Sequence, residues 1–219
     1  MPIAEKYSVD FCEDDIFHVY NRTNNKELLF ANDENRTFFL RKYRQYLSPF
    51  VETFCWCLMS NHFHILLRVK KESEILAILK SRPRFVLSST DCKFIQGEIV
   101  LSQVIERIFT RFFQSYTLAF NKMHNRKGNL FYKSFKRLLV SGNDHLLNAI
   151  LYIHANPVHH GVVKSLAQYK WSSFHEILSG DPTWLNRNDV LDWFGGRAAF
   201  IKAHTGVNEP SALKCYLEE

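Results

Sequence analysis

FCWCLMSNHFHILLRV, residues 54–69, is the stretch of the chain that decides its fold. Apolar, aromatic and β-branched residues fill both halves of it, and the short break at 59–61 separates them. This pattern predicts two strands joined by a tight turn. Because successive side chains of a strand alternate between its faces, His62 and His64 are expected to point one way and Phe63 the other. The stretch therefore predicts a β-hairpin that presents two neighbouring imidazoles.

Two imidazoles on one rigid strand face can supply half of a divalent metal site. The plainer alternative is a surface histidine beside a histidine that is satisfied in the core, because His-x-His is a short motif. Cys55 and Cys57 on the preceding strand are predicted to be small buried hydrophobic residues. A zinc site in which Cys57 joins His62 and His64 is a further alternative, although Cys-x-Cys is shorter than the usual cysteine spacing of structural zinc sites.

A second constellation lies much later in the chain. Asn143 or Asp144 can cap a helix there, apolar residues follow at helical spacing, and Pro157 is expected to end the helix. Tyr152 and Asn156 are four residues apart, so they share one face of that helix. A phenol oxygen and an amide oxygen presented together suit a nucleophile and a neutral metal ligand. Taken alone, the same pair is more often a simple detail of a helix end.

Together the two constellations resemble the single-tyrosine HUH transposases of bacterial insertion sequences, and most closely their domesticated relatives, the REP-associated tyrosine transposases. The matching motifs follow the family's order from about Asp15 to Phe174, most of the chain. They are FHVYNR at 17–22, MSNHFH at 59–64, GNLFYKSFK at 128–136 and YIHANPVHHG at 152–161. The Tyr-Ile-x-x-Asn-Pro element with a His-hydrophobic-His pair upstream is specific. The connection from Glu72 to Gly97 is longer than expected in the compact members.

The resemblance implies both a fold and a reaction. The fold would be α+β, with a mainly antiparallel, RRM-like or ferredoxin-like sheet that carries the histidines on a central strand and has helices packed on it. The enzyme would be a transposase, a DNA strand transferase that cleaves and joins single-stranded DNA at hairpin or palindromic repeats. Tyr152 would attack the phosphodiester and form a 5′-phosphotyrosine. His62, His64 and Asn156 would hold Mg²⁺ or Mn²⁺, which orients and polarises the phosphate.

Two other functions stay open beside the enzyme. One is a catalytically silent protein that binds hairpin DNA on the same scaffold, and the other is a zinc-stabilised RNA-binding module. The intact histidine pair and Tyr152 favour the enzyme, because a binding protein has no chemical need for them. Tyr116 is the rival nucleophile, but it lies within a long predicted helix, and Asn121 is five residues away and off its face. A core or DNA-groove tyrosine is the expectation for Tyr116.

The remaining histidines receive weaker assignments. His18 is expected either near the metal, on an adjacent strand, or in support of the sheet. His154 is two residues from Tyr152 and is expected to project elsewhere on the helix. His159 and His160 are expected in a loop near DNA.

Composition sets broad limits on the function. The chain has 219 residues and 46% of them are hydrophobic, which excludes a largely disordered protein. No apolar run approaches the roughly 20 residues that span a bilayer. The N-terminal residues lack a signal-peptide core, so the cytoplasm is the expected compartment. Five cysteines, an odd number, form no disulfide-framework pattern. The net charge of +6 is compatible with a polyanionic partner.

Basic residues gather in one stretch, where aromatic residues alternate with them. Lysine and arginine would neutralise phosphates there, and exposed aromatic rings would stack on unpaired bases. The alternative is a solvated basic face above a buried aromatic stripe. The predicted DNA-binding residues are Lys122, Arg126, Lys127, Lys133, Lys136 and Arg137.

The order of predicted elements is β, α, β-hairpin, α, β, α, which suggests an α+β sandwich. The hairpin is expected to run from Val51 to Val69, and further strands are expected at 16–22 and 129–140. Helices are expected after Asn32 or Asp33, at 72–80, at 102–123 and around Tyr152, whereas 88–91 is expected to be a loop. The predicted domain is 1–178, and 179–219 is a helical extension of unknown role. Whether the chain forms a homodimer is left open.

Overall fold

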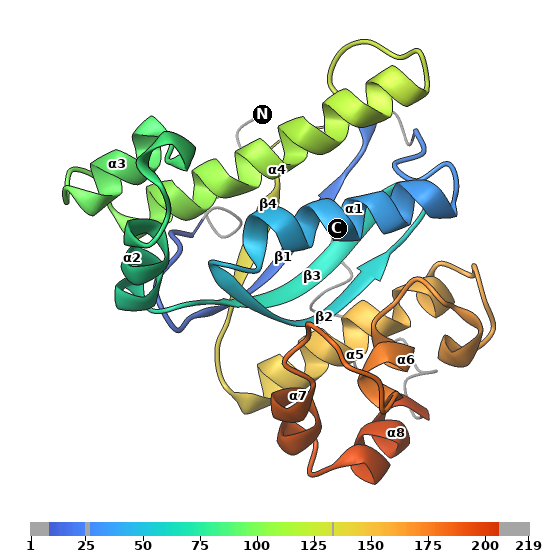
Figure 1. The fold of residues 1–219 in the computed structure, drawn as a ribbon. Helices are drawn as coiled ribbons and strands as arrows, with labels where there is room; N and C mark the ends of the chain where they lie inside the picture. The colour runs from blue at the N-terminus through green and yellow to red at the C-terminus, as the bar shows by residue number, and fades with distance from the viewer. Residues whose placement is uncertain (1–8, 25–26, 133, 206–219) are drawn as a thin grey trace.

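The predicted hairpin forms in the computed structural model, which describes residues 9–24, 27–132 and 134–205 (Figure 1). Four described strands form one antiparallel sheet, and helices cover both of its faces, which confirms the α+β class. The strands are β1 (Ile16–Arg22), β2 (Val51–Leu58), β3 (His62–Val69) and β4 (Lys136–Val140). The helices are α1 (Asp33–Leu47), α2 (Glu72–Lys80), α3 (Ser89–Ile95), α4 (Leu101–Met123), α5 (Asn143–His159), α6 (Phe174–Leu178), α7 (Arg187–Trp193) and α8 (Arg197–Thr205).

The strand order is β2-β3-β1-β4, and each neighbouring pair is antiparallel. Strands β1 and β2 both run opposite to β3, so they are parallel to each other with β3 between them. Helix α1 connects them, and α4 lies between β3 and β4 in the chain. This is the split βαβ arrangement of ferredoxin-like folds. The order places β3, which carries the histidine pair, and β1 at the centre of the sheet.

The register decides which side chains share the histidine face. Tyr20 on β1 lies opposite His64 on β3 and opposite Lys136 on β4. Arg22 lies opposite His62 at the end of the same ladder. Side chains that are directly opposite in antiparallel strands project from the same face. The histidine face therefore combines groups from three strands.

The opposite face of the sheet packs against α1 and α4, which lie side by side above it in Figure 1. Phe63 points into this layer, as predicted, with its ring 5.0 Å from that of Phe39 and 5.8 Å from that of Phe113, measured between centroids. All three side chains are buried. Burial of a phenylalanine contributes about 1.5–3 kcal/mol. This aromatic layer holds the hairpin in register, because a slip of one residue would exchange Phe63 for the histidines.

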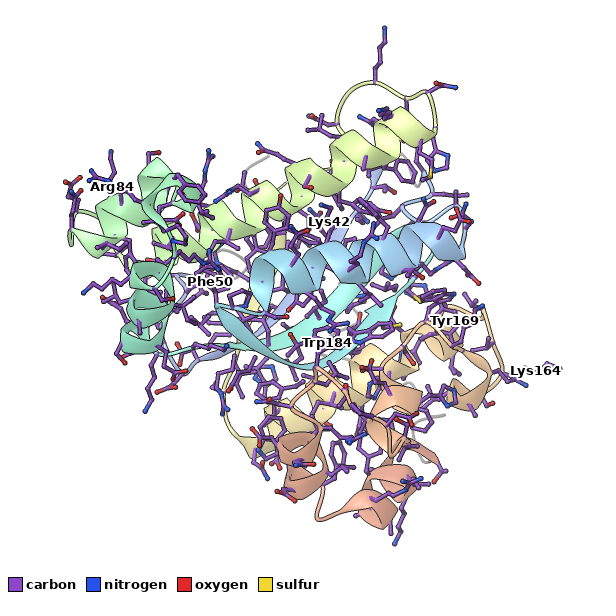
Figure 2. The ribbon with its side chains drawn as sticks, viewed as in Figure 1. Lys42, Phe50, Arg84, Lys164, Tyr169 and Trp184 are labelled. Atoms are coloured by element: carbon purple, nitrogen blue, oxygen red, sulfur yellow. The ribbon has the colours of Figure 1, made fainter. Side chains whose placement is uncertain are left out.

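Helix α5 and the C-terminal helices cover the histidine face and the β2 side of the sheet (Figure 1). The backbone N–H of Asn186 donates to the carbonyl of Thr53 at 2.9 Å, and the rings of Phe54 and Trp193 lie 4.6 Å apart. Figure 2 marks Tyr169 in the segment that leads into α6, and its hydroxyl donates to a β2 carbonyl. The predicted division at 178 stays a prediction, but the described part of the extension packs directly on the sheet. None of the described helices is long and apolar enough to cross a membrane.

Helix α5 differs from its prediction at both ends. Gly142 precedes it with φ 80°, so neither Asn143 nor Asp144 is the N-cap. At the other end Pro157 lies inside the helix, which continues to His159. Proline removes its own N–H donor and crowds the carbonyl four residues earlier, but the N–H of His160 still donates to the carbonyl of Asn156 at 3.0 Å. The helix therefore extends two residues beyond the predicted stop.

Two other boundaries were wrong. Ser88 caps α3 instead of lying in a loop, because Ser88 and Asp91 form a reciprocal capping box that the motif Ser-x-x-Asp encodes. The predicted strand at 129–140 is paired as a strand only from Lys136 onward. Before β4, an isolated bridge joins Phe131 to Thr23, just past the end of β1.

Candidate active site between the sheet and helix α5

Helix α5 brings the two predicted constellations together. Atom Nε2 of His62 lies 3.1 Å from Oδ1 of Asn156, and the rings of His64 and Tyr152 are 5.6 Å apart between centroids. Tyr152 and Asn156 are both buried against the sheet, as two residues that share one helix face must be. The four predicted residues thus meet at one place, although they come from segments about ninety residues apart.

The histidine pair has a defined geometry. The rings of His62 and His64 lie 5.1 Å apart and are nearly perpendicular, with an interplanar angle of 88°. Both rings project from the same face of β3, as predicted. Burial lowers the pKa of His62 to about 4, and burial also lowers the pKa of His64 well below its usual value. Both imidazoles are therefore neutral near pH 7, which is the form that binds metals.

The surroundings of His62 test whether these residues fit a divalent cation. Nδ1 lies 2.7 Å from Oδ1 of Asn61, and Nε2 faces Oδ1 of Asn156 at 3.1 Å. A neutral imidazole has one N–H donor, so it can donate to only one of these oxygens. With the proton on Nδ1, the lone pair of Nε2 faces an amide oxygen. Two ligand atoms about 2.1 Å from one octahedral ion lie about 3 Å apart, so a cation would satisfy both. The donor set fits.

The zinc alternative finds less support. Within the described residues, no group of three or more His, Cys, Asp or Glu side chains could hold a metal ion. Cys57 lies opposite His64 in the hairpin, but its Sγ contacts Sδ of Met59 at 3.9 Å. Burial raises the pKa of the Cys57 thiol, which keeps it in the protonated form that binds metals poorly. Cys55 and Cys57 are buried free thiols, as predicted.

The two candidate tyrosines lie on opposite faces of the sheet. Tyr152 contacts the histidine face, with its ring 6.0 Å from that of His18. Tyr116 is buried in the α1–α4 layer, where its hydroxyl donates to the carbonyl of Leu29 at 2.8 Å. Burial raises the pKa of the Tyr116 phenol, which makes it a weaker nucleophile. The geometry therefore favours Tyr152 over Tyr116.

The other histidines divide between the site and the core. His18 is buried beside His64, with 2.9 Å between Nε2 of His18 and Nδ1 of His64. The ring of His160 lies 5.3 Å from that of His62, at the end of α5. His159 is the last residue of α5 instead of a loop residue. His154 projects away from the site, as predicted, and bonds to groups on the far side of α5.

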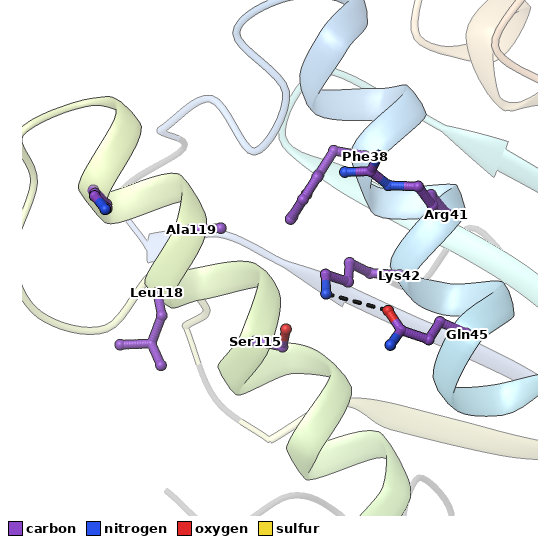
Figure 3. A pocket seen from close by; sticks show the side chains of 8 residues that line it. Phe38, Arg41, Lys42, Gln45, Ser115, Leu118 and Ala119 are labelled. Atoms are coloured by element: carbon purple, nitrogen blue, oxygen red, sulfur yellow. Dashed lines mark hydrogen bonds between the residues drawn. The ribbon is translucent and has the colours of Figure 1, made fainter.

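The predicted DNA-binding lysines are distributed over different surfaces. Lys122 lines a shallow groove between α1 and α4, on the layer opposite the histidine face, together with Arg41 and Lys42 (Figure 3). Lys127 is exposed in the turn after α4. Lys136 lies next to the site, with its Nζ 5.3 Å from the centre of the Tyr20 ring. Lys133 lies outside the described residues.

The two predicted DNA-binding arginines are part of the fold. Arg137 is buried, forms an ion pair with Glu106, and lies over the ring of Phe11 at 4.6 Å. Arg126 forms an ion pair of 2.5 Å with Glu27 and donates to nearby carbonyls. The placement of Arg137 is a correction, because even-numbered residues of β4 share the histidine face whereas 137 points into the α1–α4 layer. The intramolecular partners of both arginines argue against free phosphate contacts.

One of the aromatic residues that alternate with the basic residues is exposed at the rim of the site. The side chain of Tyr132 is 51% exposed, and the guanidinium of Arg22 lies 5.4 Å from its ring centre. The backbone N–H of Tyr132 donates to the carbonyl of Arg22 at 3.0 Å, which fixes this segment beside β1. Since Arg22 is opposite His62, the aromatic ring and the cation flank the histidine pair. The position of Tyr132 and Arg22 beside the histidine pair depends on the strand register, which the sequence pattern does not give.

Comparisons with known proteins bear on the resemblance. No family model matches the chain. A curated protein of Haemophilus influenzae, named "Putative REP-associated tyrosine transposase", is 27% identical over 135 residues, which are 61% of this chain and 64% of that protein. The match thus spans less than two thirds of that relative's length. It confirms that the chain resembles the REP-associated tyrosine transposases.

The solved structures contain a weaker likeness. It is described as "Structure of the REP associates tyrosine transposase bound to a REP hairpin" and matches 84% of this chain and 94% of that chain. The TM-score is 0.49 and the sequence identity is 18%. At that level the likeness leaves both fold and function to be argued from the chain itself.

Proposed function

We propose that the chain is a DNA strand transferase of the REP-associated tyrosine transposase kind, with Tyr152 as nucleophile. The observation that supports this most is the meeting of Tyr152 and Asn156 of α5 with the histidine pair of β3. A phenol, two neutral imidazoles and an amide oxygen at one buried place match the requirements of phosphodiester transfer. The proposed substrate is single-stranded DNA that contains a hairpin or palindromic repeat, as the motif resemblance implies.

In the proposed reaction the phenol oxygen of Tyr152 attacks a backbone phosphorus atom. The bond from Tyr152 to phosphorus forms while the bond to the 3′-oxygen breaks, so the products are a 5′-phosphotyrosine and a 3′-hydroxyl. Strand joining is the reverse attack by a 3′-hydroxyl, and no nucleotide hydrolysis is needed. A divalent ion held by His62, His64 and Asn156 would supply charge stabilisation at the phosphate. Mg²⁺ or Mn²⁺ suits these donors.

The phenol must lose a proton, because its unperturbed pKa is near 10. His159 is the candidate acceptor among the described residues. Its ring lies 6.3 Å from that of Tyr152, and it is seven residues further along the same helix, so both lie on one face. Both of its ring nitrogens are buried and have no hydrogen-bond partner among the described residues. Burial lowers the pKa of His159, which keeps it neutral and able to accept a proton.

The test uses the full chain, labelled single-stranded DNA from the flanks of its own gene, and Mn²⁺. The expected result is a covalent protein–DNA band that survives denaturation and disappears in Tyr152→Phe, which lacks only the attacking oxygen. Tyr116→Phe is the matched control and should keep the band. Retention of the band in Tyr152→Phe and its loss in Tyr116→Phe would place the nucleophile on α4. Hairpin binding without any band would support the silent DNA-binding alternative.

A further inference from the structure

A third histidine, His18, lies beside the proposed metal ligand His64, on the side away from Asn156's partner His62. His18 on β1 is fully buried, and its ring lies 5.1 Å from that of His64 on β3. The two rings are joined by the contact of 2.9 Å between Nε2 of His18 and Nδ1 of His64. Register explains the position, because His18 and His64 project from the same face of neighbouring strands, two residues apart across the ladder.

Two neutral imidazoles can share this contact in only two ways. In the first, Nδ1–H of His64 donates to Nε2 of His18, and Nε2 of His64 carries a lone pair. In the second, Nε2–H of His18 donates to Nδ1 of His64, and Nε2 of His64 carries a proton. Both rings are buried, which favours the neutral form of each, so one proton is available for the contact. Only the first arrangement lets Nε2 of His64 bind a cation.

We propose that His18 is a positioning residue that accepts the proton of Nδ1–H of His64 and so holds His64 in its metal-binding tautomer. The inference rests on the proposed function for its purpose, but it is a statement about two protein groups. His18 is not proposed as a ligand, because its Nε2 is directed at His64. Metal-binding histidines commonly have such an acceptor on their other ring nitrogen, and loss of that acceptor weakens metal binding about 10–100-fold.

Three substitutions separate this role from simple packing. His18→Gln places an amide oxygen near the position of Nε2, where it can still accept from His64. His18→Asn is the matched control, because its shorter side chain places the oxygen near the position of Nδ1. His18→Leu fills the space without any acceptor. Each full-length variant is compared with the unmodified chain in thermal unfolding, in Mn²⁺ titration by calorimetry, and in ¹⁵N NMR of the His64 ring without metal.

The expected NMR result is that metal-free His64 carries its proton on Nδ1 in the unmodified chain and in His18→Gln. His18→Asn and His18→Leu should lose this preference and bind Mn²⁺ about 10–100-fold more weakly, whereas His18→Gln should bind Mn²⁺ nearly as tightly as the unmodified chain. A proton on Nε2 of His64 in the unmodified chain would overturn the proposal, as would Mn²⁺ binding in His18→Asn and His18→Leu as tight as in the unmodified chain.

The two readouts keep this proposal distinct from the proposed function. If the unmodified chain fails to bind Mn²⁺ or Mg²⁺, the metal part of the proposed function is wrong, and the NMR spectrum of metal-free His64 still decides the role of His18. If His18→Leu does not fold, the pair His18→Gln and His18→Asn carries the comparison, since both are polar and similar in size.

Discussion

Nδ1 of His154 lies 2.9 Å from Nε2 of His204, and this contact joins helix α5 to helix α8. The positions of the protons follow from the neighbours. Nδ1–H of His204 donates to the carbonyl of Phe200 at 2.8 Å, so its Nε2 must accept from His154. Nε2 of His154 then accepts from the hydroxyl of Ser173, whose oxygen accepts the N–H of Trp56. A neutral hydrogen-bonded chain thus connects α8, through the helix that carries Tyr152, to strand β2.

His204→Ala should destabilise the protein by about 1–3 kcal/mol, because it leaves Nδ1–H of buried His154 without an acceptor. His204→Gln should recover part of this loss, since its amide oxygen can take the place of Nε2. Lys202→Ala is the control on the same helix, because Lys202 is exposed. Urea unfolding at neutral pH measures all three. Equal stabilities for His204→Ala and Lys202→Ala would show that the contact does not hold α8 in place.

Stability should fall as the pH drops below about 6.5. Burial lowers the pKa of His204 to about 4 and that of His154 well below its usual value. The unfolded chain binds protons at these histidines near pH 6.5, whereas the folded chain does not, so their contribution is complete above that pH. Between about pH 6.5 and about pH 4, each should cost up to about 1.4 kcal/mol per pH unit. Urea unfolding at several pH values measures the slope, which should be shallower in His204→Gln.

Charge neutralisation should separate phosphate contacts from charges that support the fold. Lys127→Gln is expected to lower the slope of log K against log salt by about one, because the exposed lysine releases one counterion when DNA binds. Arg137→Gln should leave that slope unchanged and reduce the free energy of unfolding by about 1–3 kcal/mol, since it breaks the pair with Glu106. Binding titrations at several salt concentrations and urea unfolding check both. If Arg137→Gln changed the slope of log K against log salt, Arg137 would be a phosphate contact after all.

Tyr132→Leu should weaken binding to single-stranded DNA by about 1–3 kcal/mol, because the exposed ring can stack on an unpaired base. Phe85→Leu is the matched control, since Phe85 is 90% exposed in the short 3-10 helix (Arg84–Val86) between α2 and α3. Fluorescence titration with a labelled oligonucleotide measures the difference. If the two variants bound the oligonucleotide equally well, Tyr132 would not contact single-stranded DNA.

His159→Phe should slow formation of the covalent adduct about 10²–10⁴-fold while DNA binding changes little, because the proposed proton acceptor is removed and the ring shape is kept. Single-turnover kinetics with trapped adduct give the rate. The rate of the variant should recover at higher pH, where the phenol ionises without help. His160→Phe is the neighbouring control. A normal rate in His159→Phe at neutral pH would exclude its role as acceptor.

Local patterns were sufficient for most of the individual elements. The spans of β1, β2, β3 and α2 agree with their predictions, because strand alternation and helical spacing depend on residues a few positions apart. The same reasoning placed His62 and His64 on one face and paired Tyr152 with Asn156. Errors occurred where two local signals compete. Pro157 was predicted to end helix α5, but backbone hydrogen bonds beyond it continue the helix to His159. The polar stretch at Ser88 was predicted to be a loop, but Ser88 caps helix α3.

The sequence by itself therefore determined which side chains share a face, while only the tertiary structure decided which faces meet. His18 and His64 are 46 positions apart, and His62 and Asn156 are 94 positions apart. Their contacts depend on the strand order β2-β3-β1-β4 and on α5 packing against the face opposite α1 and α4. The same packing buries Arg137, which the charge pattern had assigned to DNA. Backbone periodicity sets which side chains share a face of a helix or strand. Which faces pack together depends on burying the apolar surface of the whole chain, and a short window of sequence does not contain that information.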